Sequence, residues 1–539
     1  MFRSCSLFRH EVCRSSFMIR HHHTSAARLF ALTLSLPLAF GALTSASAAE
    51  AKAKLLIEHA TIIPVDGSGR YYESGYVLID AEGKIASVGA GQAPDSMSAQ
   101  QTIDATGKIV MPGFLSGHSH LYQSPFRGIG AHHNLMGWIY CYHRTYGPHY
   151  DASDLYWFSK HGAMDYLGHG ITTIYDWTLN AGGNTVDEYV DLYRGSLDSG
   201  ARIIFGYGVD LDKSAEENYS MLERYLEIIK EEGIDASHPR VPAVWMAGLG
   251  LLNGRESTLM EMSLAKAFDL PIQVHYLEDP EPNYTKIQQG LFPVYDEAGV
   301  MGANLNFAHF INVTDPILER TGESGTTMVW NPLSNGRLAS GLADIPHYEE
   351  MGIEVGMGID GQASADISDP FENMRMGLYA TRMKYQDATI MMPLDVLRYH
   401  TIGTARVLGI EEQVGSLEVE KWGDLILIDP RSMETSPVLN PIEHVVLACS
   451  VANLETVFVA GEAVVERGEF TQVDYEETKS EVTRRVALVQ AKVDADHAAQ
   501  DPSVMDQGPI FRGLTEYKDQ KHFTEDHEHP TYGKPKEVE

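Results

Sequence analysis

The sequence predicts an α/β fold in which a (β/α)₈ barrel is inserted between two halves of a smaller β domain. Between residue 109 and about residue 400, eight short apolar runs alternate with longer helical stretches. A strand followed by a helix, repeated in this way, implies parallel strands. Before this region and again from Gly415, short β-rich runs are separated by glycine turns. An open doubly wound sheet is the alternative, but no Gly-x-Gly-x-x-Gly follows the first run.

The composition sets limits on partners. The chain has 539 residues, which is enough for one large domain and a smaller one. Its formal net charge is −33. Nucleic acids and anionic membrane surfaces attract basic proteins, so we expect neither as a partner. A small-molecule substrate is expected instead.

The N-terminal region has the pattern of a secretory signal peptide. Several arginines precede an apolar run at Leu29–Leu43, and small residues follow at Ser45–Ala49. The apolar run is short for a membrane span, so no stable span is expected once the signal is removed. We predict a signal peptide over residues 1–48, starting at Met1 or Met18. The mature protein is then exported, either periplasmic or secreted.

The next segment, residues 49–110, reads as the first half of the small β domain. Glycine turns at Asp66-Gly67 and Glu82-Gly83 separate its runs, which favours an antiparallel sheet. The predicted strands are Leu55–Ile57, Ala60–Ile63, Gly75–Ile79 and Lys84–Val88.

Residues 111–402 are predicted to form the barrel domain, whose first strand begins slightly earlier. The eight predicted strands are Ile109–Leu115, Ile171–Asp176, Arg202–Val209, Val241–Leu251, Pro271–Tyr276, Ala303–Phe310, Thr326–Trp330 and Glu354–Ile359. Helices predicted between them include Ala152–Leu167, Val186–Gly200, Ala215–Glu232 and Ser257–Phe268.

The chain then returns to the small domain over residues 403–472, and residues 473–539 form a C-terminal helix and a polar tail. The helix is predicted from Tyr475 to about His497. Predicted strands of the second half are Ser416–Val419, Asp424–Ile428, His444–Leu447 and Thr456–Ala460.

Ionisable residues stand at the ends of four predicted barrel strands. His118 and His120 follow the first, His275 ends the fifth, His309 ends the sixth and Asp360 follows the eighth. Residues two apart in a strand point to the same side, so His118 and His120 leave it together. Catalytic groups of such barrels gather at the C-terminal strand ends. A single histidine there could be an ordinary polar residue, but five coincidences favour one site.

These residues are suited to one divalent metal ion. Three imidazole nitrogens and a carboxylate oxygen, from His118, His120, His275 and Asp360, fit Zn²⁺, and Fe²⁺ or Mn²⁺ are also compatible. Such an ion makes hydroxide available near neutral pH. The fourth predicted strand, Val241–Leu251, contains no Lys, Asp or Glu that could bridge a second metal. The sequence therefore favours a single ion.

Catalysis at such a site also needs a proton carrier. Glu278 lies three residues after His275, at the exit of the strand, and we assign it as the general acid and base. It could instead be a solvated loop residue beside Asp279. His309 is expected to orient or polarise the reacting groups, or to act as an extra ligand. Asp360 would both bind the metal and accept a proton from the attacking water.

These residues belong to a series of short motifs that are spread along the chain. They are Pro112-Gly113-Phe114, His118-Ser-His120, His275-x-x-Glu278, Ala308-His309, Asn331-Pro-Leu-Ser-Asn335, Asp360-Gly361, Gly415-Ser-Leu-Glu-Val and Asp424-Leu-Ile-Leu-Ile-Asp429.

Over roughly residues 52–470, these motifs resemble the amidohydrolase superfamily, in particular its branch of cytosine and guanine deaminases and triazine chlorohydrolases. The resemblance implies a distorted (β/α)₈ barrel with a composite β-sandwich built from N- and C-terminal segments. It also implies hydrolytic attack at an aromatic or amidine-like carbon, with ammonia, chloride or an amine leaving. The implied metal ligands are His118, His120, His275 and Asp360, and the implied acid and base groups are Glu278 and His309.

Two positions depart from this pattern. Many such relatives carry a His or Ser at the end of the fourth strand, where this chain has Gly248, and a His where it has Trp330. A bulky Trp330 predicts a more hydrophobic or differently shaped substrate pocket. Gln123, just past the paired histidines, resembles a residue that holds a ring carbonyl or nitrogen of the substrate. Gln123 and Trp330 are therefore the predicted substrate contacts.

The predicted function is that of an exported hydrolase that removes the amino group of a nitrogen heterocycle with a metal-activated water. The first alternative is amide, carbamate or halide hydrolysis at the same mononuclear site. A non-catalytic binding protein on the same scaffold is the second, although it predicts a missing ligand or acid and every expected position is filled. The sequence specifies neither the substrate nor the oligomeric state, and a homo-oligomer is compatible with it.

Overall fold

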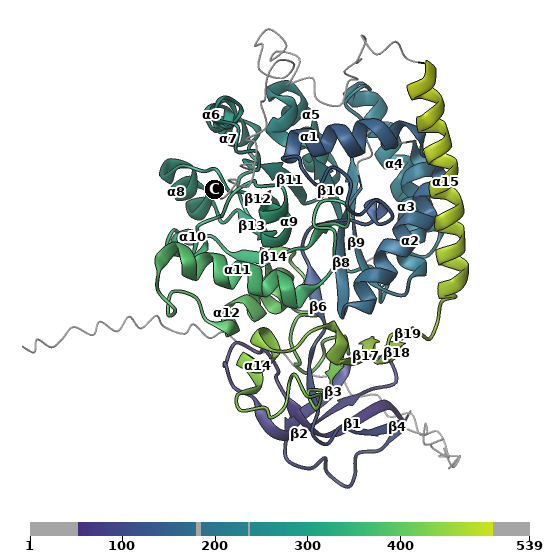
Figure 1. Cartoon of the computed structure of the whole chain (residues 1–539), viewed down its shortest axis with the longest axis vertical. Helices are drawn as coiled ribbons and strands as arrows, with labels where there is room; N and C mark the ends of the chain where they lie inside the picture. The colour runs from purple at the N-terminus through teal and green to yellow at the C-terminus, as the bar shows by residue number, and fades with distance from the viewer. Residues whose placement is uncertain (1–51, 179–184, 235–237, 500–539) are drawn as a thin grey trace, which may run out of the picture. The chain divides into compact units, whose positions relative to one another are not determined.

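The computed structural model describes residues 52–178, 185–234 and 238–499 (Figure 1). The predicted signal peptide, residues 1–48, and the predicted polar tail beyond residue 499 lie outside these ranges. Within them, no helix is both long enough and apolar enough to cross a bilayer.

Eight parallel strands form a nearly closed barrel, which confirms the predicted fold class. Each strand pairs with the next along the chain, and almost every strand residue is buried because helices cover the outside of the barrel. The strands are β6 (Phe114–Ser116), β8 (Ile171–Trp177), β9 (Arg202–Gly208), β10 (Val244–Gly248), β11 (Ile272–Tyr276), β12 (Leu305–His309), β13 (Thr327–Trp330) and β14 (Val355–Met357).

The predicted first strand, Ile109–Leu115, is divided between two sheets. Its first part, β5 (Ile109–Pro112), belongs to the small domain, and β6 begins the barrel. Gly113 makes the change of sheet possible, since a Cβ atom there would lie 2.3 Å from Thr172 Oγ1. A continuous apolar run cannot reveal such a division, because both parts are buried.

The ends of the eight-strand order meet at a short parallel pair, β7 (Ser119–His120) and β15 (Asp360–Gly361). The Asp360 amide donates to the His118 carbonyl oxygen at 3.0 Å, and the Gly117 amide donates to the Met357 carbonyl oxygen at 3.0 Å. This junction brings the start and the end of the barrel domain together.

The predicted helices between the barrel strands are present. Their N-termini carry strong signals: Asp151 caps α2 and Ser214 caps α4, each in a reciprocal capping box. The helices of the barrel half are α1 (Leu135–Ile139), α2 (Ala152–Gly168), α3 (Val186–Asp198), α4 (Ala215–Glu231), α5 (Arg255–Phe268), α6 (Pro282–Leu291), α7 (Pro293–Ala298), α8 (Asp315–Ser324), α9 (Pro332–Arg337), α10 (Ile345–Glu350), α11 (Pro370–Tyr385), α12 (Pro393–Arg398) and α13 (Thr404–Val407).

The N- and C-terminal segments share one nine-stranded sheet, as predicted, but the sheet is mixed rather than antiparallel. β1 pairs antiparallel with β2 and parallel with both β4 and β5. Its strands are β1 (Ala53–Ile62), β2 (Tyr72–Ile79), β3 (Ile85–Ala90), β4 (Ala99–Asp104), β5, β16 (Leu425–Ile428), β17 (Leu454–Val459), β18 (Glu462–Glu466) and β19 (Glu469–Phe470).

Two predicted strands of the second half are wrong. His444–Leu447 lies in the helix α14 (Pro441–Leu447), which begins because Asn440 accepts from two amides and Pro441 occupies the first turn. Val445 and Val446 of this helix are buried by tertiary packing. The sequence pattern alone therefore predicted a strand. Ser416–Val419 forms no strand, and Glu420 turns the chain with a φ of 75°.

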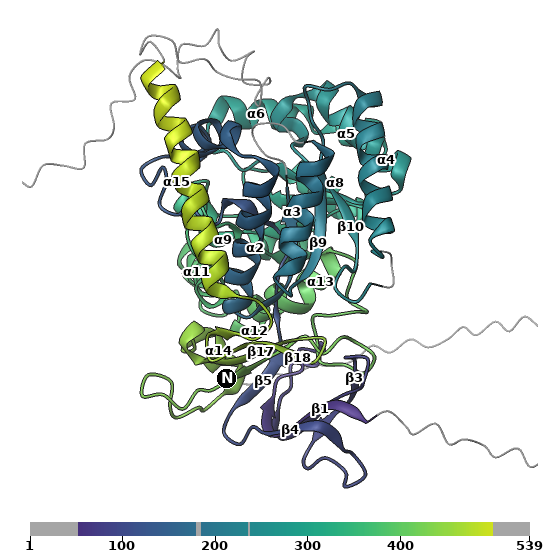
Figure 2. The same cartoon turned by 90° about the vertical axis from the view of Figure 1, so that its right-hand side faces the viewer.

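The predicted C-terminal helix is α15 (Tyr475–Ala499), which lies along α2 in both views (Figures 1 and 2). Val482, Val489 and Val493 form its buried stripe. Arg485 donates to Asp154 Oδ1 of α2 at 2.9 Å. The helix therefore covers the outside of the barrel, on the side of its first helices.

Candidate metal centre and active site

The paired histidines leave the start of the barrel with fixed ring orientations. His118 Nδ1 lies 2.6 Å from Gln273 Oε1, and His120 Nδ1 lies 3.0 Å from the Trp177 carbonyl oxygen. Both partners are acceptors, so each Nδ1 carries the hydrogen. The Nε2 lone pair of each ring is then free for a metal ion.

His275 and Asp360 complete a compact set of ligand atoms. His275 Nε2 lies 3.3 Å from His120 Nε2. Asp360 Oδ1 lies 3.2 Å from His120 Nε2 and 3.6 Å from His118 Nε2. Ligands in a tetrahedral shell with bonds of about 2.0–2.1 Å are about 3.4 Å apart. The predicted ligand residues thus converge with the spacing that a divalent ion requires.

The hydrogen-bond inventory supports the same fit. His118 Nε2, His309 Nε2 and Glu278 Oε1 are buried atoms without a hydrogen-bond partner. Buried polar atoms are costly unless something pairs with them. Potential ligand atoms of His118, His275 and His309 lie within 4.8 Å of one another, as do those of His118, His120 and Asp360. These residues fit a metal ion.

Glu278 and His309 lie beside this cluster. Glu278 Oε1 is 3.6 Å from His309 Nδ1, and the Glu278 residue is 3% exposed, so it is not a solvated loop residue. His309 Nδ1 also lies 2.8 Å from Asn335 Nδ2 and 3.4 Å from Asn331 Nδ2. Asn331 is the N-cap residue of α9, the helix after the seventh barrel strand, and Asn335 lies within that helix.

The backbone is strained at two of these strand ends. His309 has a φ of 70° and Asp360 a φ of 72°. A left-handed conformation is unfavourable for residues with a Cβ, typically by about 1 kcal/mol or more. The surrounding barrel holds these residues in place, and both side chains belong to the cluster.

Burial and neighbouring charges set the protonation states. Burial raises the pKa of Glu278 well above its ordinary value, and the nearby Asp360 and Asp279 carboxylates add to this. Burial alone would also raise the pKa of Asp360, but the surrounding histidines hold it well below its ordinary value. Burial lowers the pKa of His118 and His275 well below the ordinary value, and that of His309 to about 4. The two carboxyl groups are therefore shifted in opposite directions, Glu278 towards the protonated form and Asp360 towards the ionised form.

The two predicted substrate contacts lie in different surroundings. Gln123 is fully buried at the site. Its Oε1 abuts Gly361, where a Cβ atom would lie 1.9 Å from that oxygen. The Nε2 atom of Gln123 lies 3.4 Å from His143 Nε2. Trp330 is also fully buried, but its ring edge faces α11, where a Cβ atom at Gly377 would lie 2.6 Å from Trp330 Cη2. The indole is thus part of the packing between strand and helix.

Sequence reasoning missed three residues that the fold brings to the site. Gln273 contacts His118, His143 contacts Gln123, and Tyr166 donates its hydroxyl to the Asp360 carbonyl oxygen at 2.5 Å. Gln273 could have been found, because it precedes His275 by two residues and shares its face of the strand. The other two lie on helical segments distant in sequence, where no periodicity indicates the contact.

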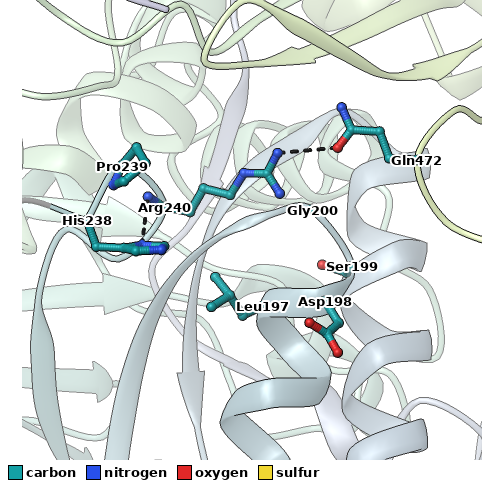
Figure 3. A pocket seen from close by; sticks show the side chains of 8 residues that line it. All are labelled: Leu197, Asp198, Ser199, Gly200, His238, Pro239, Arg240 and Gln472. Carbon is teal, nitrogen blue, oxygen red and sulfur yellow. Dashed lines mark hydrogen bonds between the residues drawn. The ribbon is translucent and has the colours of Figure 1, made fainter. Parts of the chain in front are cut away.

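A cavity of about 420 Å³ lies away from this cluster, near the start of β9 (Figure 3). Arg240 crosses it and donates to Gln472 Oε1 at 3.3 Å. The cavity is at the N-terminal end of the strands, whereas the histidines and carboxylates lie at the C-terminal ends. Its lining contains none of the predicted site residues.

A barrel whose strand ends gather histidines and carboxylates in this way defines a metal-dependent hydrolase. The chain belongs to the amidohydrolase family, whose model matches residues 109–464. It is 28% identical over 450 residues to a 5-methylthioadenosine/S-adenosylhomocysteine deaminase of Syntrophobacter fumaroxidans, covering 80% of this chain and 97% of the relative.

Solved structures share the fold at lower identity. An adenosine deaminase from Xanthomonas campestris with bound zinc superimposes with a TM-score of 0.73 at 21% identity, covering 82% of this chain and 99% of that one. Atrazine chlorohydrolase from Arthrobacter aurescens, complexed with zinc, has a TM-score of 0.69 at 22% identity, covering 81% and 100%. The similarity therefore extends through the barrel and the mixed sheet.

Proposed function

We propose that the protein is a mononuclear, metal-dependent deaminase of an amino-substituted nitrogen heterocycle. The observation that carries the proposal is the convergence of His118, His120, His275 and Asp360 beside the buried Glu278. Zn²⁺ is the proposed ion, held by those first four residues. The deaminase among the relatives, matched along 97% of its length, supports this reaction.

The chain's own groups can carry each proton of the reaction. When bound, the metal ion lowers the pKa of a water molecule and so makes a nucleophile available near neutral pH. Glu278, whose pKa is raised by burial, donates a proton to a ring nitrogen of the substrate as water attacks the adjacent carbon. Asp360, whose pKa is lowered, accepts the proton of the attacking water and passes it to the amino group, which leaves as ammonia. Glu278 then takes back the proton of the new hydroxyl group as the carbon becomes a carbonyl.

We propose an aminopurine carried on a nucleoside as the substrate class. The name of the Syntrophobacter fumaroxidans relative supports this class. Gln123 is positioned to hold the heterocycle, since its buried Oε1 has no hydrogen-bond partner. A substrate amino group or ring N–H would satisfy that acceptor.

The decisive experiment measures ammonia release by the metal-loaded protein. The panel comprises adenosine, 5′-methylthioadenosine, S-adenosylhomocysteine, guanine and an amino-triazine. We expect release from at least one nucleoside, and Glu278→Gln should lower the rate by about 10²–10⁴-fold while the metal content stays unchanged. Glu319→Gln makes the same substitution at an exposed position on α8 and should leave the rate unaltered.

The outcomes separate the candidate reactions. Wild-type activity in Glu278→Gln would remove Glu278 from the mechanism. Absence of ammonia from every compound, with metal bound, would contradict deamination of these heterocycles. Chloride released from a chlorinated triazine would then support the hydrolysis of another leaving group at the same site.

We further propose that the protein is exported. The basic, apolar and small-residue regions within residues 1–48 support this proposal. Mass spectrometry of the N-terminus of protein recovered from outside the cytoplasm should locate cleavage after Ala48 or one residue later. A full-length N-terminus retained in the cytoplasm would contradict export.

A further inference from the structure

A row of polar side chains crosses the interior of the barrel below the metal cluster. Gln273 on β11 pairs in register with Asn306 on β12, and Asn306 pairs with Thr327 on β13. Gln273 and Asn306 are both 0% exposed. Gln273 Nε2 donates to Asn306 Oδ1 at 2.8 Å, and Asn306 Nδ2 donates to Thr327 Oγ1 at 2.8 Å. These three residues form a continuous polar row.

The row can hold the Gln273 amide in one orientation only. Its Nε2 also donates to the Gly117 carbonyl oxygen at 2.8 Å. A backbone carbonyl can only accept, so the Gln273 atom beside it must be the NH₂ group. The other atom of the same amide, Oε1, then faces His118 Nδ1 at 2.6 Å.

This orientation determines which nitrogen of His118 carries the hydrogen. A neutral imidazole places its single hydrogen on either Nδ1 or Nε2. Because Gln273 offers only an acceptor, the hydrogen must lie on Nδ1, which leaves Nε2 with a lone pair beside Asp360. A reversed Gln273 amide would present an N–H to Nδ1 and put the hydrogen on Nε2, where it would block metal binding.

The two paired histidines differ in this respect. His120 owes its orientation to the backbone carbonyl of Trp177, which is fixed by β8. His118 depends on a side chain, and that side chain depends on its own neighbours. A substitution can therefore remove the support of His118 alone.

We propose that Gln273 is a positioning residue of the metal site, locked by Asn306 and Gly117, which fixes His118 in its metal-binding tautomer. The inference rests on the proposed role of His118 as a metal ligand. Outer partners of metal-bound histidines typically contribute about 10–100-fold to metal affinity. Gln273 is the described residue whose side chain supplies this contact to His118.

The test measures the affinity of the full-length apoprotein for Zn²⁺ by competition with a chelator. Gln273→Met keeps an unbranched side chain of similar length but removes the acceptor, and should weaken affinity about 10–100-fold. Asn306→Leu, which removes one of the two anchors of Gln273, should give a smaller loss in the same direction. Gln288→Met removes another fully buried glutamine, whose Oε1 accepts from the Leu277 amide, and should retain wild-type affinity.

A second readout distinguishes positioning from a general loss of structure. The absorption spectrum of the Co²⁺-loaded protein reports the ligand geometry, and it should change in Gln273→Met and stay unchanged in Gln288→Met. Circular dichroism verifies that both variants fold, and Asn306→Leu provides the test if Gln273→Met does not fold. Wild-type metal affinity in a folded Gln273→Met protein would overturn the inference, whereas a wild-type protein that binds no metal would overturn the proposed function itself.

Discussion

Single side chains at the barrel mouth owe their properties to burial. The pKa of Glu278 is raised, first by burial and then by the charge of Asp360, while the histidines around Asp360 lower the pKa of its carboxyl group. Two neighbouring carboxyl groups are therefore shifted towards opposite protonation states. That difference suits one as an acid and the other as a base.

Another buried carboxyl group, Glu261 on α5, predicts a pH dependence of stability. It is 1% exposed, and burial raises its pKa to about 7, although the amides of Leu249 and Gly250 donate to it. In the unfolded chain a glutamate has a pKa of about 4.3. Between these values the native state binds more protons, so this contribution to stability is complete at low pH and falls as the pH rises towards 7, by about 4 kcal/mol in all.

Glu261→Gln removes this titration. The difference in unfolding free energy between wild type and variant should therefore change in favour of the variant as the pH rises from about 5 to 8. Urea unfolding of the metal-loaded proteins at several pH values measures it. A difference that stays constant over that range would contradict a raised Glu261 pKa.

At the scale of whole elements, α15 connects the end of the described chain to the segment that follows the paired histidines. Besides its contacts with α2, Lys492 donates to the His149 carbonyl oxygen at 2.7 Å, and Tyr146 donates to Gln490 Oε1 at 3.0 Å. The same segment reaches the site through His143 and Gln123. The helix thus supports this segment from outside, at Tyr146 and His149.

Loss of the buried stripe of α15 should release this support. Val489 is 0% exposed and the adjacent Leu488 is 51% exposed, so the two residues form a matched pair. Val489→Asn buries an amide in place of an apolar group, at a cost of about 3 kcal/mol to docking. Hydrogen exchange should rise in α15 and in residues 140–150 of that variant. Equal exchange in Val489→Asn and Leu488→Asn would show that the segment does not depend on α15.

For the molecule as a whole, a buried ion pair joins the barrel to the mixed sheet. Arg202, at the start of β9, donates to both carboxylate oxygens of Asp424, at 2.7 and 2.9 Å. Its guanidinium also lies 5.0 Å from the ring centroid of Trp422. Asp424 precedes β16, so the pair connects residues that are far apart in sequence but adjacent in the fold.

Removing one partner of this pair leaves a buried charge. Arg202→Met should lower the unfolding free energy by about 3–5 kcal/mol. Arg431→Met removes an arginine that is paired with Asp429 on the surface and should change it by no more than about 1 kcal/mol. Denaturant unfolding compares the two variants. Similar small effects would mean that solvent reaches Arg202 and Asp424.

The sequence by itself determined the barrel, the composite origin of the second sheet and the residues at the strand ends. These features follow from local rules: burial on both faces gives apolar runs, and the ends of parallel strands meet at one edge. The same local rules misread α14 as a strand, because buried valines occur in both kinds of element. They also could not divide the run at Gly113 between two sheets.

Only the tertiary structure decided how the strand-end residues work together. It placed Asp360 beside the paired histidines by closing the barrel between β7 and β15, and it turned the Trp330 ring towards α11. It also set the Gln273 amide through Asn306 and Gly117. Each of these depends on contacts between residues distant in sequence, whose positions no period or motif specifies. The sequence specifies the side-chain types, but their protonation states and amide orientations depend on the neighbours that each side chain has in the folded protein.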